Sequence, residues 1–160
     1  MRRSVISAVA LVAATQFIGF GSAQQAQALG TCYETGCNGK PAASYTCVND
    51  AEIIYNVNLY NPEALVQIAG NLQLKYSPSC RVVWARVISN IGGGGDAGVF
   101  NTQDTYNTED CQITGPAGTG CNTPMLNDGG KINGVNVTSR AAADIYLLDG
   151  TLVDAETGAY

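Results

Sequence analysis

A clear alternation of apolar and polar residues occupies positions 72–76. Leucine or tyrosine stands at every second position there, which is the period of a strand with one buried face. Residues 77–79 read Ser-Pro-Ser and suit a tight turn, because proline fixes φ near the value that the turn requires. The run 80–88 is apolar on both faces, as in a covered strand. The pattern predicts a hairpin over 72–88 at the centre of a β core.

Weaker patterns predict further strands on both sides of this hairpin. Residues 50–60 are rich in residues with high β preference, and a C-terminal hairpin is expected from 144–148 and 151–154 around Asp149-Gly150. Residues 99–105 give another strand signal. Segment 63–69 fits either one or two helical turns or a strand, and we expect a strand.

Two glycine-rich segments predict loops. The four consecutive glycines at 92–95 are expected to form a flexible connection, because glycine weakens strands and helices alike. Residues 108–123 are expected to form a loop closed by a disulfide bond. Several short strands separated by turn residues, without an amphipathic helix, indicate an all-β fold, a small antiparallel sandwich or barrel stapled by disulfides.

The first 28 residues have the pattern of a signal peptide. Two arginines precede a mostly apolar run over 5–20, and Ala26-Gln27-Ala28 offers small residues at a cleavage point. The run contains Thr15 and Gln16 and is shorter than the roughly 20 apolar residues of a membrane-spanning helix. We therefore expect a signal peptide over 1–28, a single secreted domain over 29–160, and no stable membrane span.

All six cysteines follow the expected cleavage point. An even number in an exported chain predicts three disulfides. Zinc binding is the alternative, but the chain has no histidine and no CxxC pair. Closeness in sequence favours Cys111 with Cys121. The remaining four cysteines allow three pairings, of which we prefer Cys37 with Cys47 and Cys32 with Cys80.

The composition excludes several classes of function. The whole chain has a formal charge of −5, and removal of Arg2 and Arg3 lowers it by two, to −7, which disfavours nucleic acid and anionic membranes as partners. Without histidine, neither a Ser-His-Asp nor a Cys-His nucleophile can form. A pair of carboxylates could still catalyse hydrolysis. The candidate carboxylates are Asp104, Glu109, Asp110, Asp128 and Asp144.

Four other features have both a binding and a structural interpretation. Asn127–Gly130 offers oxygen ligands that suit calcium, although it matches known calcium loops poorly. Arg81 and Arg86 could bind a carboxylate or phosphate ligand, but we expect an ion pair or a solvated head group. Trp84, the only tryptophan, is expected in the core rather than on a ligand platform. We assign no catalytic, cofactor or metal residues.

Three segments resemble the YjfA-like family of small exported bacterial domains. They are CYETGC at 32–37, followed by Cys47, then the run 76–86, and TPMLNDG at 123–129. The resemblance implies an extracellular bacterial β domain of unknown function and provides no catalytic residues. We therefore expect a secreted, non-catalytic binding or adaptor domain with an extracellular protein or cell-surface ligand as partner. A carboxylate-dependent, glycosidase-like secreted hydrolase is the alternative.

Overall fold

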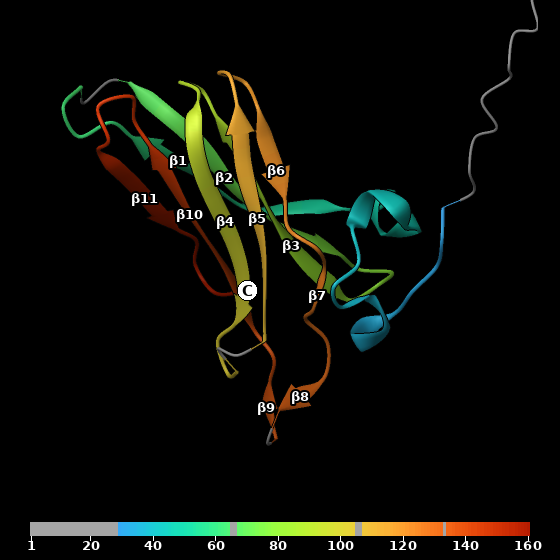
Figure 1. The fold of residues 1–160 in the computed structure, drawn as a ribbon. Helices are drawn as coiled ribbons and strands as arrows, with labels where there is room; N and C mark the ends of the chain where they lie inside the picture. The colour runs from blue at the N-terminus through green and yellow to red at the C-terminus, as the bar shows by residue number, and fades with distance from the viewer. Residues whose placement is uncertain (1–28, 65–66, 105–106, 133) are drawn as a thin grey trace, which may run out of the picture.

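The computed structural model describes residues 29–64, 67–104, 107–132 and 134–160 (Figure 1). The expected signal peptide, 1–28, lies outside the described residues and stays a prediction. Within the described part of the chain, no helix is both long and apolar enough to cross a membrane. Three short 3-10 helices precede the strands: η1 (Glu34–Cys37), η2 (Ala42–Ser44) and η3 (Thr46–Val48).

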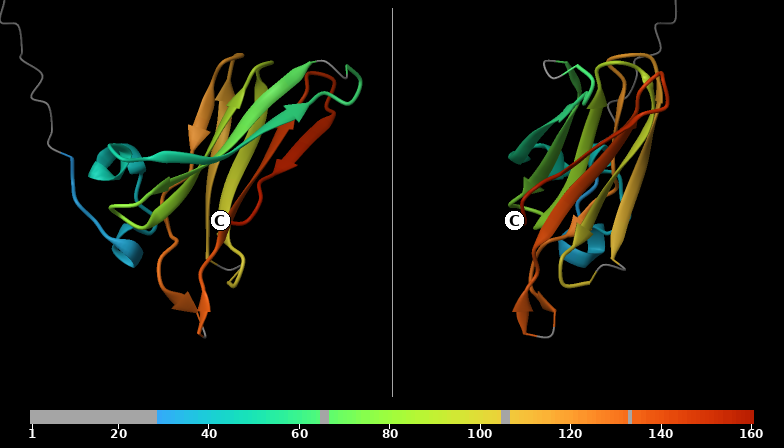
Figure 2. Two further views of the ribbon diagram at one scale, coloured as in Figure 1. Left: turned by 180° about the vertical axis from the view of Figure 1, so that it is seen from behind. Right: turned by 90° about the vertical axis from the view of Figure 1, so that its left-hand side faces the viewer.

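Two antiparallel sheets pack face to face, as the two turned views show (Figure 2). The first has the order β1-β2-β3-β6, and β7 also pairs with β3; its strands are β1 (Glu52–Tyr60), β2 (Ile68–Ser77), β3 (Val82–Ser89), β6 (Gly120–Asn122) and β7 (Leu126–Asn127). The second has the order β11-β10-β4-β5; its strands are β4 (Gly93–Asn101), β5 (Thr108–Gly115), β10 (Ser139–Tyr146) and β11 (Leu152–Glu156). A small hairpin joins β8 (Lys131–Ile132) to β9 (Val135–Asn136). The predicted all-β fold is confirmed, and of the two expected architectures, sandwich or barrel, the protein has the sandwich.

The main core lies between the two sheets. Alternate residues of each strand point inward, so both sheets contribute aliphatic side chains to one buried cluster. Its members include Leu72, Leu74, Val83, Val87, Val99, Ile113, Ala141 and Ile145. Burial of these side chains stabilises the sandwich, at about 1.5 to 3 kcal/mol for each large aliphatic side chain.

The predicted central hairpin is confirmed as β2 and β3, which pair from Gly70 with Ser89 to Ser77 with Val82. The second strand begins at Val82 rather than at Cys80. Arg81 has a φ of 54°, in the left-handed region, and its N–H donates to Ser77 O at 2.8 Å. This turn reverses the chain before the ladder starts.

Trp84 is buried, as predicted, with 2% of its surface exposed. It lies in a second cluster on the other side of the five-stranded sheet, beneath the N-terminal segment, with Cys37, Cys47, Val82 and Met125. The three 3-10 helices thus cover only the end of that sheet near β7, and Figure 1 shows them beside β3 and β7. The rest of the outer face is left uncovered by this segment.

The glycine run does not form the expected loop, because Gly93–Gly95 begins β4. The neighbouring strand β10 approaches closely. A Cβ at Gly95 would lie 2.4 Å from Asp144 O, and one at Gly93 would lie 2.7 Å from Tyr146 O. Glycine is required here by the close backbone contact, so the local preference against strands is overridden.

Residues 108–123 are also not a loop, since they contain β5 and β6. These strands belong to different sheets, and the predicted disulfide between Cys111 and Cys121 joins them with a Cα separation of 6.0 Å. The bridge therefore fastens the two layers along one edge.

Segment 63–69 was also partly mispredicted as strand, because β2 begins only at Ile68. Before it, Asn61 Oδ1 accepts a hydrogen bond from Glu63 N at 2.9 Å and holds a turn.

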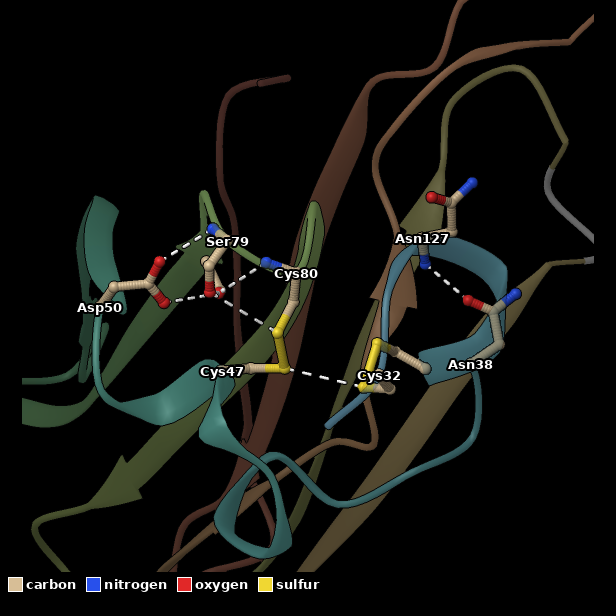
Figure 3. The surroundings of a disulfide bond; sticks show 9 residues. Cys32, Asn38, Cys47, Asp50, Ser79, Cys80 and Asn127 are labelled. Atoms are coloured by element: carbon tan, nitrogen blue, oxygen red, sulfur yellow. Dashed lines mark hydrogen bonds between the residues drawn. A yellow bond between two sulfur atoms is a disulfide. The ribbon is translucent and has the colours of Figure 1, made fainter. Parts of the chain in front are cut away.

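The preferred pairing of the first four cysteines is wrong. The bonded pairs are Cys32 with Cys37 and Cys47 with Cys80, with Cα separations of 5.3 and 5.6 Å. The turn of η1 folds Cys32 back onto Cys37, and η3 places Cys47 beside the turn that precedes β3 (Figure 3). All four sulfur atoms nevertheless lie within 4.8 Å of one another. Because the four sulfur atoms lie so close together, small changes in the path of η1 and η3 decide which pairs bond.

Candidate functional site

The uncovered part of the five-stranded sheet presents a set of amide side chains to solvent. We call this surface the amide face. Cross-strand register places its residues in two rows. One row is Asn56, Gln73, Arg86 and Asn122, and the adjacent row contains Asn58 and Asn71.

Hydrogen bonds hold part of the amide face in a fixed arrangement. Asn71 Nδ2 donates to Asn56 Oδ1 at 2.6 Å and to Asn58 Oδ1 at 3.1 Å. Gln73 Oε1 is buried and has no hydrogen-bond partner among the described residues. An unpaired buried acceptor costs roughly 1 to 3 kcal/mol. If the neighbouring side chains moved aside, a ligand could donate a hydrogen bond to Gln73 Oε1, and this bond would remove the penalty.

The same side of the sheet is locally positive in an acidic protein. Lys75 and Arg86 both point outward, and none of the described outward-facing residues of β1, β2, β3 and β6 is acidic. Burial, and then the positive charge of Arg86, lowers the pKa of Lys75. Lys75 Nζ lies 5.8 Å from the centre of the Trp84 ring. Desolvated cations of this kind favour a negatively charged ligand group.

A pocket of ≈ 300 Å³ continues the amide face toward the N-terminal segment. Asn122 belongs to both the face and the pocket, Lys75 forms part of the wall, and the almost fully buried Trp84 also reaches the lining. Residues of the N-terminal segment, including Ala42 and Val48, complete the lining. The pocket offers a partly apolar recess beside the polar rows.

Four of the five predicted carboxylates lie on the four-stranded sheet or in the loop that follows β4, and they are spread over both of its faces. Asp110 and Asp144 point outward, Glu109 points inward, and Asp104 follows β4. Burial raises the pKa of Glu109. The structure brings Asp144 beside Asp96 and Asp154, its cross-strand partners, and burial together with these two charges raises its pKa.

We call this outer surface of the four-stranded sheet the acidic face. Its acidic residues are Asp96, Asp110, Asp144, Asp154 and Glu156. Arg140 is the described cation on it, and its Nη1 lies 3.0 Å from Glu156 Oε1. Because this ion pair is exposed, it contributes at most about 1 kcal/mol to stability.

Asp128 lies apart from the other candidates, at the end of the sandwich near β7. Burial raises its pKa to about 6, and the hydrogen bond that Ser139 Oγ donates at 2.6 Å acts in the opposite direction. Arg81 and Lys131 line a shallow pocket of ≈ 350 Å³ with it. Ser139 and Asp144 are five positions apart on β10 and point to opposite faces, which separates Asp128 from Asp144 by roughly 17 Å along the strand. These two carboxyl groups cannot act on one glycosidic bond.

The proposed calcium loop uses its own oxygen atoms internally. Asn127 Oδ1 accepts from Gly129 N at 3.0 Å, and Asn127 Nδ2 donates to Gly129 O at 3.0 Å. One carboxylate oxygen of Asp128 is held by Ser139. Calcium binding, which the sequence left open without assigning metal residues, would require these bonds to be exchanged for metal ligation.

The two central arginines differ in their surroundings. Arg81 Nη1 lies 3.0 Å from Glu34 Oε1 and also donates to the hydroxyl of Tyr33, so the expected structural ion pair is confirmed. Among the described residues, Arg86 has no carboxylate within ion-pair distance. Its guanidinium group is therefore available on the amide face.

The amide face was missed in the sequence, although a signal for it exists. Asparagine is depleted in strands. It nevertheless stands at alternate positions 56 and 58 of a strongly predicted strand, and an amide again occupies 71 and 73. Amide residues that recur with period two in these strands indicate a solvent-facing polar surface.

One family model matches residues 35–135, which is more than half of the chain. The match includes every residue of the amide face and ends before β10 and β11. No curated protein and no solved structure matches the chain. The matching family is described as "Protein of unknown function (DUF2690)", and the chain belongs to it.

Proposed function

We propose that this protein is a secreted bacterial, non-catalytic binding domain whose amide face holds a carboxylate-bearing polysaccharide at the cell surface. Arg86, unpaired among the described residues and flanked by amide side chains on an outer sheet face, is the observation that carries this proposal. The disulfide-stapled fold fits an oxidising, extracellular environment.

The chemistry of the face suits sugar acids. Asparagine and glutamine amides both donate and accept, so they match the hydroxyl groups of a sugar ring. The guanidinium group of Arg86 can bind a carboxylate through two parallel hydrogen bonds. Lys75 adds a second positive charge, and the pocket beside Trp84 gives an apolar recess for a ring face.

The shape and charge of the sandwich support the same ligand. A flat sheet face with polar rows can accommodate an extended chain, whereas small molecules usually bind in deep, mostly apolar pockets. The acidic face on the opposite side repels a polyanion. A polyanionic chain would therefore be directed to the amide face.

Two features support a non-catalytic role. The chain has no histidine, and none of its cysteines is free. The usual activated nucleophiles are therefore missing. Among the five candidate carboxylates, Asp128 and Asp144 lie on opposite sides of the four-stranded sheet and cannot form a catalytic pair.

The binding proposal is tested by titrating the purified domain with a uronic-acid polysaccharide and with a neutral polysaccharide of the same length, using calorimetry. We expect binding to the acidic polymer alone, weakened at least tenfold in Arg86→Gln. Arg140→Gln, on the acidic face, is the matched control and should bind as the parent does. Equal binding of both polymers, or equal loss in the two variants, would contradict the proposal.

A hydrolase remains the second candidate because of one observation, the pKa of Asp128, which burial raises to about 6. A carboxyl group with such a pKa can act as a general acid near neutral pH. A screen of glycoside substrates with the parent and Asp128→Asn tests this. Activity that disappears in the variant would support catalysis, and no activity in the parent would reject it.

A further inference from the structure

The four cysteines at the N-terminal end form one compact sulfur cluster. Cys37, Cys47 and Cys80 are almost completely buried, whereas Cys32 is partly exposed. The two disulfides touch each other: Cys32 Sγ lies 3.7 Å from Cys47 Sγ, across the pairs (Figure 3). All four sulfur atoms lie within 4.8 Å of one another.

This arrangement is close to that of a tetrahedral metal site. Zinc binds thiolates at about 2.3 Å in tetrahedral geometry, so the sulfur atoms of a Cys₄ site are about 3.8 Å apart. The distance between Cys32 and Cys47 already matches this value. The two bonded pairs would have to separate, each by less than about 2 Å, because a disulfide bond is about 2.05 Å long. The other sulfur pairs, all within 4.8 Å, would have to adjust by about 1 Å or less.

We propose that reduction of these two disulfides converts the cluster into a zinc site with Cys32, Cys37, Cys47 and Cys80 as its four ligands. In the reduction, each disulfide takes up two electrons and two protons and gives two thiols. A phosphine supplies the electrons and becomes a phosphine oxide with an oxygen atom from water. Zn²⁺ then displaces four protons from the four thiols.

The surroundings of the cluster suit both chemical states. Ser79 Oγ lies 3.8 Å from Cys80 Sγ and donates toward it, as hydrogen-bond donors around metal-bound thiolates do. Asp50 fixes this serine, because its Oδ2 accepts from Ser79 N at 2.8 Å. Either the Cys47–Cys80 disulfide or one zinc ion would join the N-terminal segment to the turn before β3. The fold could therefore be stapled in an oxidising or a reducing compartment.

The test uses the mature chain, reduced with a phosphine and titrated with Co²⁺, which reports tetrahedral thiolate ligation by its visible absorption. We expect one Co²⁺ per chain with a tetrahedral thiolate spectrum, and displacement by Zn²⁺, which thiolate sites bind more tightly. Near-ultraviolet circular dichroism of Trp84, which packs on the cluster, should be native-like in the reduced zinc form.

Two variants localise the site. Cys37→Ser should weaken Co²⁺ binding at least tenfold and distort its spectrum, whereas the double variant Cys111→Ser with Cys121→Ser should still bind one ion. The proposal is overturned if the reduced parent gives no tetrahedral spectrum, or if the second variant loses the ion. Metal binding without the native Trp84 signal would also overturn it, because the ion would then be held by an unfolded chain.

Discussion

The two outer faces of the sandwich differ in charge although they are built on similar antiparallel sheets. The amide face has asparagine, glutamine and two nearby cations, whereas the acidic face has a row of adjacent carboxylates. Adjacent like charges are destabilising across strands. The comparison shows that the core residues of both sheets determine the sandwich, while the outward residues, free of packing demands, give each face its own chemistry.

The largest expected effect on stability comes from the part of the five-stranded sheet that the N-terminal segment covers. Trp84→Ala should lower the free energy of unfolding by about 3 to 5 kcal/mol, because it opens a cavity beneath the N-terminal segment. Tyr146→Ala, on the four-stranded sheet, is the matched control, because Tyr146 is 49% exposed. This substitution should change the free energy of unfolding by less than about 0.5 kcal/mol. Urea unfolding measures both. A small effect of Trp84→Ala would remove the tryptophan from the core.

Asp128, at the end of the sandwich between the two faces, should make the free energy of unfolding depend on pH. Its folded pKa, about 6, is above the ordinary value of 3.8, so the ionised form destabilises the folded state. The stability that protonation provides is full below about pH 4 and is lost as pH rises to about 6, up to about 3 kcal/mol. In Asp128→Asn this part of the pH dependence should disappear.

The measurement is urea unfolding of the parent and Asp128→Asn at pH 4 and pH 7. The amide can still accept the hydrogen bond from Ser139, so the two proteins should be similar at pH 4 and the variant more stable at pH 7. Parallel pH curves for the two proteins would show that the carboxyl group is solvated and not perturbed.

The smallest effect is expected on the acidic face itself. Burial and the charges of Asp96 and Asp154 raise the pKa of Asp144. Replacing it with asparagine should raise the melting temperature slightly at neutral pH, by relief of repulsion, and the gain should shrink in high salt because exposed charges are screened. Calorimetry at two salt concentrations measures this. A loss of stability in Asp144→Asn would indicate a bound cation in place of repulsion.

The sequence predicted elements whose local pattern agrees with their packing. The hairpin over 72–88 follows from alternation and a Ser-Pro-Ser turn, and both determine the register directly. The strand at Gly93–Gly95 could not be predicted, because Gly93 and Gly95 are required by carbonyl oxygens of β10, which lies more than 40 residues away in sequence. Local preference contains no information about such a close approach.

The candidate site likewise has features that the sequence predicts and features that depend on the three-dimensional fold. The absence of histidine is a property of composition, and by itself it excludes several nucleophilic mechanisms. Asp128 accepts a hydrogen bond from Ser139 of β10, whereas Asp144 points outward from the same strand. No pattern in the sequence indicates the contact between Asp128 and Ser139, so the distance between the two carboxyl groups could not be predicted. Proximity in sequence gives the observed bonds Cys32–Cys37 and Cys111–Cys121, and the preferred pair Cys37–Cys47 was wrong because it passed over the nearest partner.

The bridge from Cys47 to Cys80 has a mechanical consequence. Strands β1 and β2 lie entirely inside the loop that it closes, which spans 33 residues of separation. If the two chain ends were pulled, tension would pass through the bridge and bypass these strands. About 110 Å of chain would be shielded from extension, at roughly 3.3 Å per residue. The asparagines of β1 and β2 would then keep their positions under a load that stretches the rest of the chain.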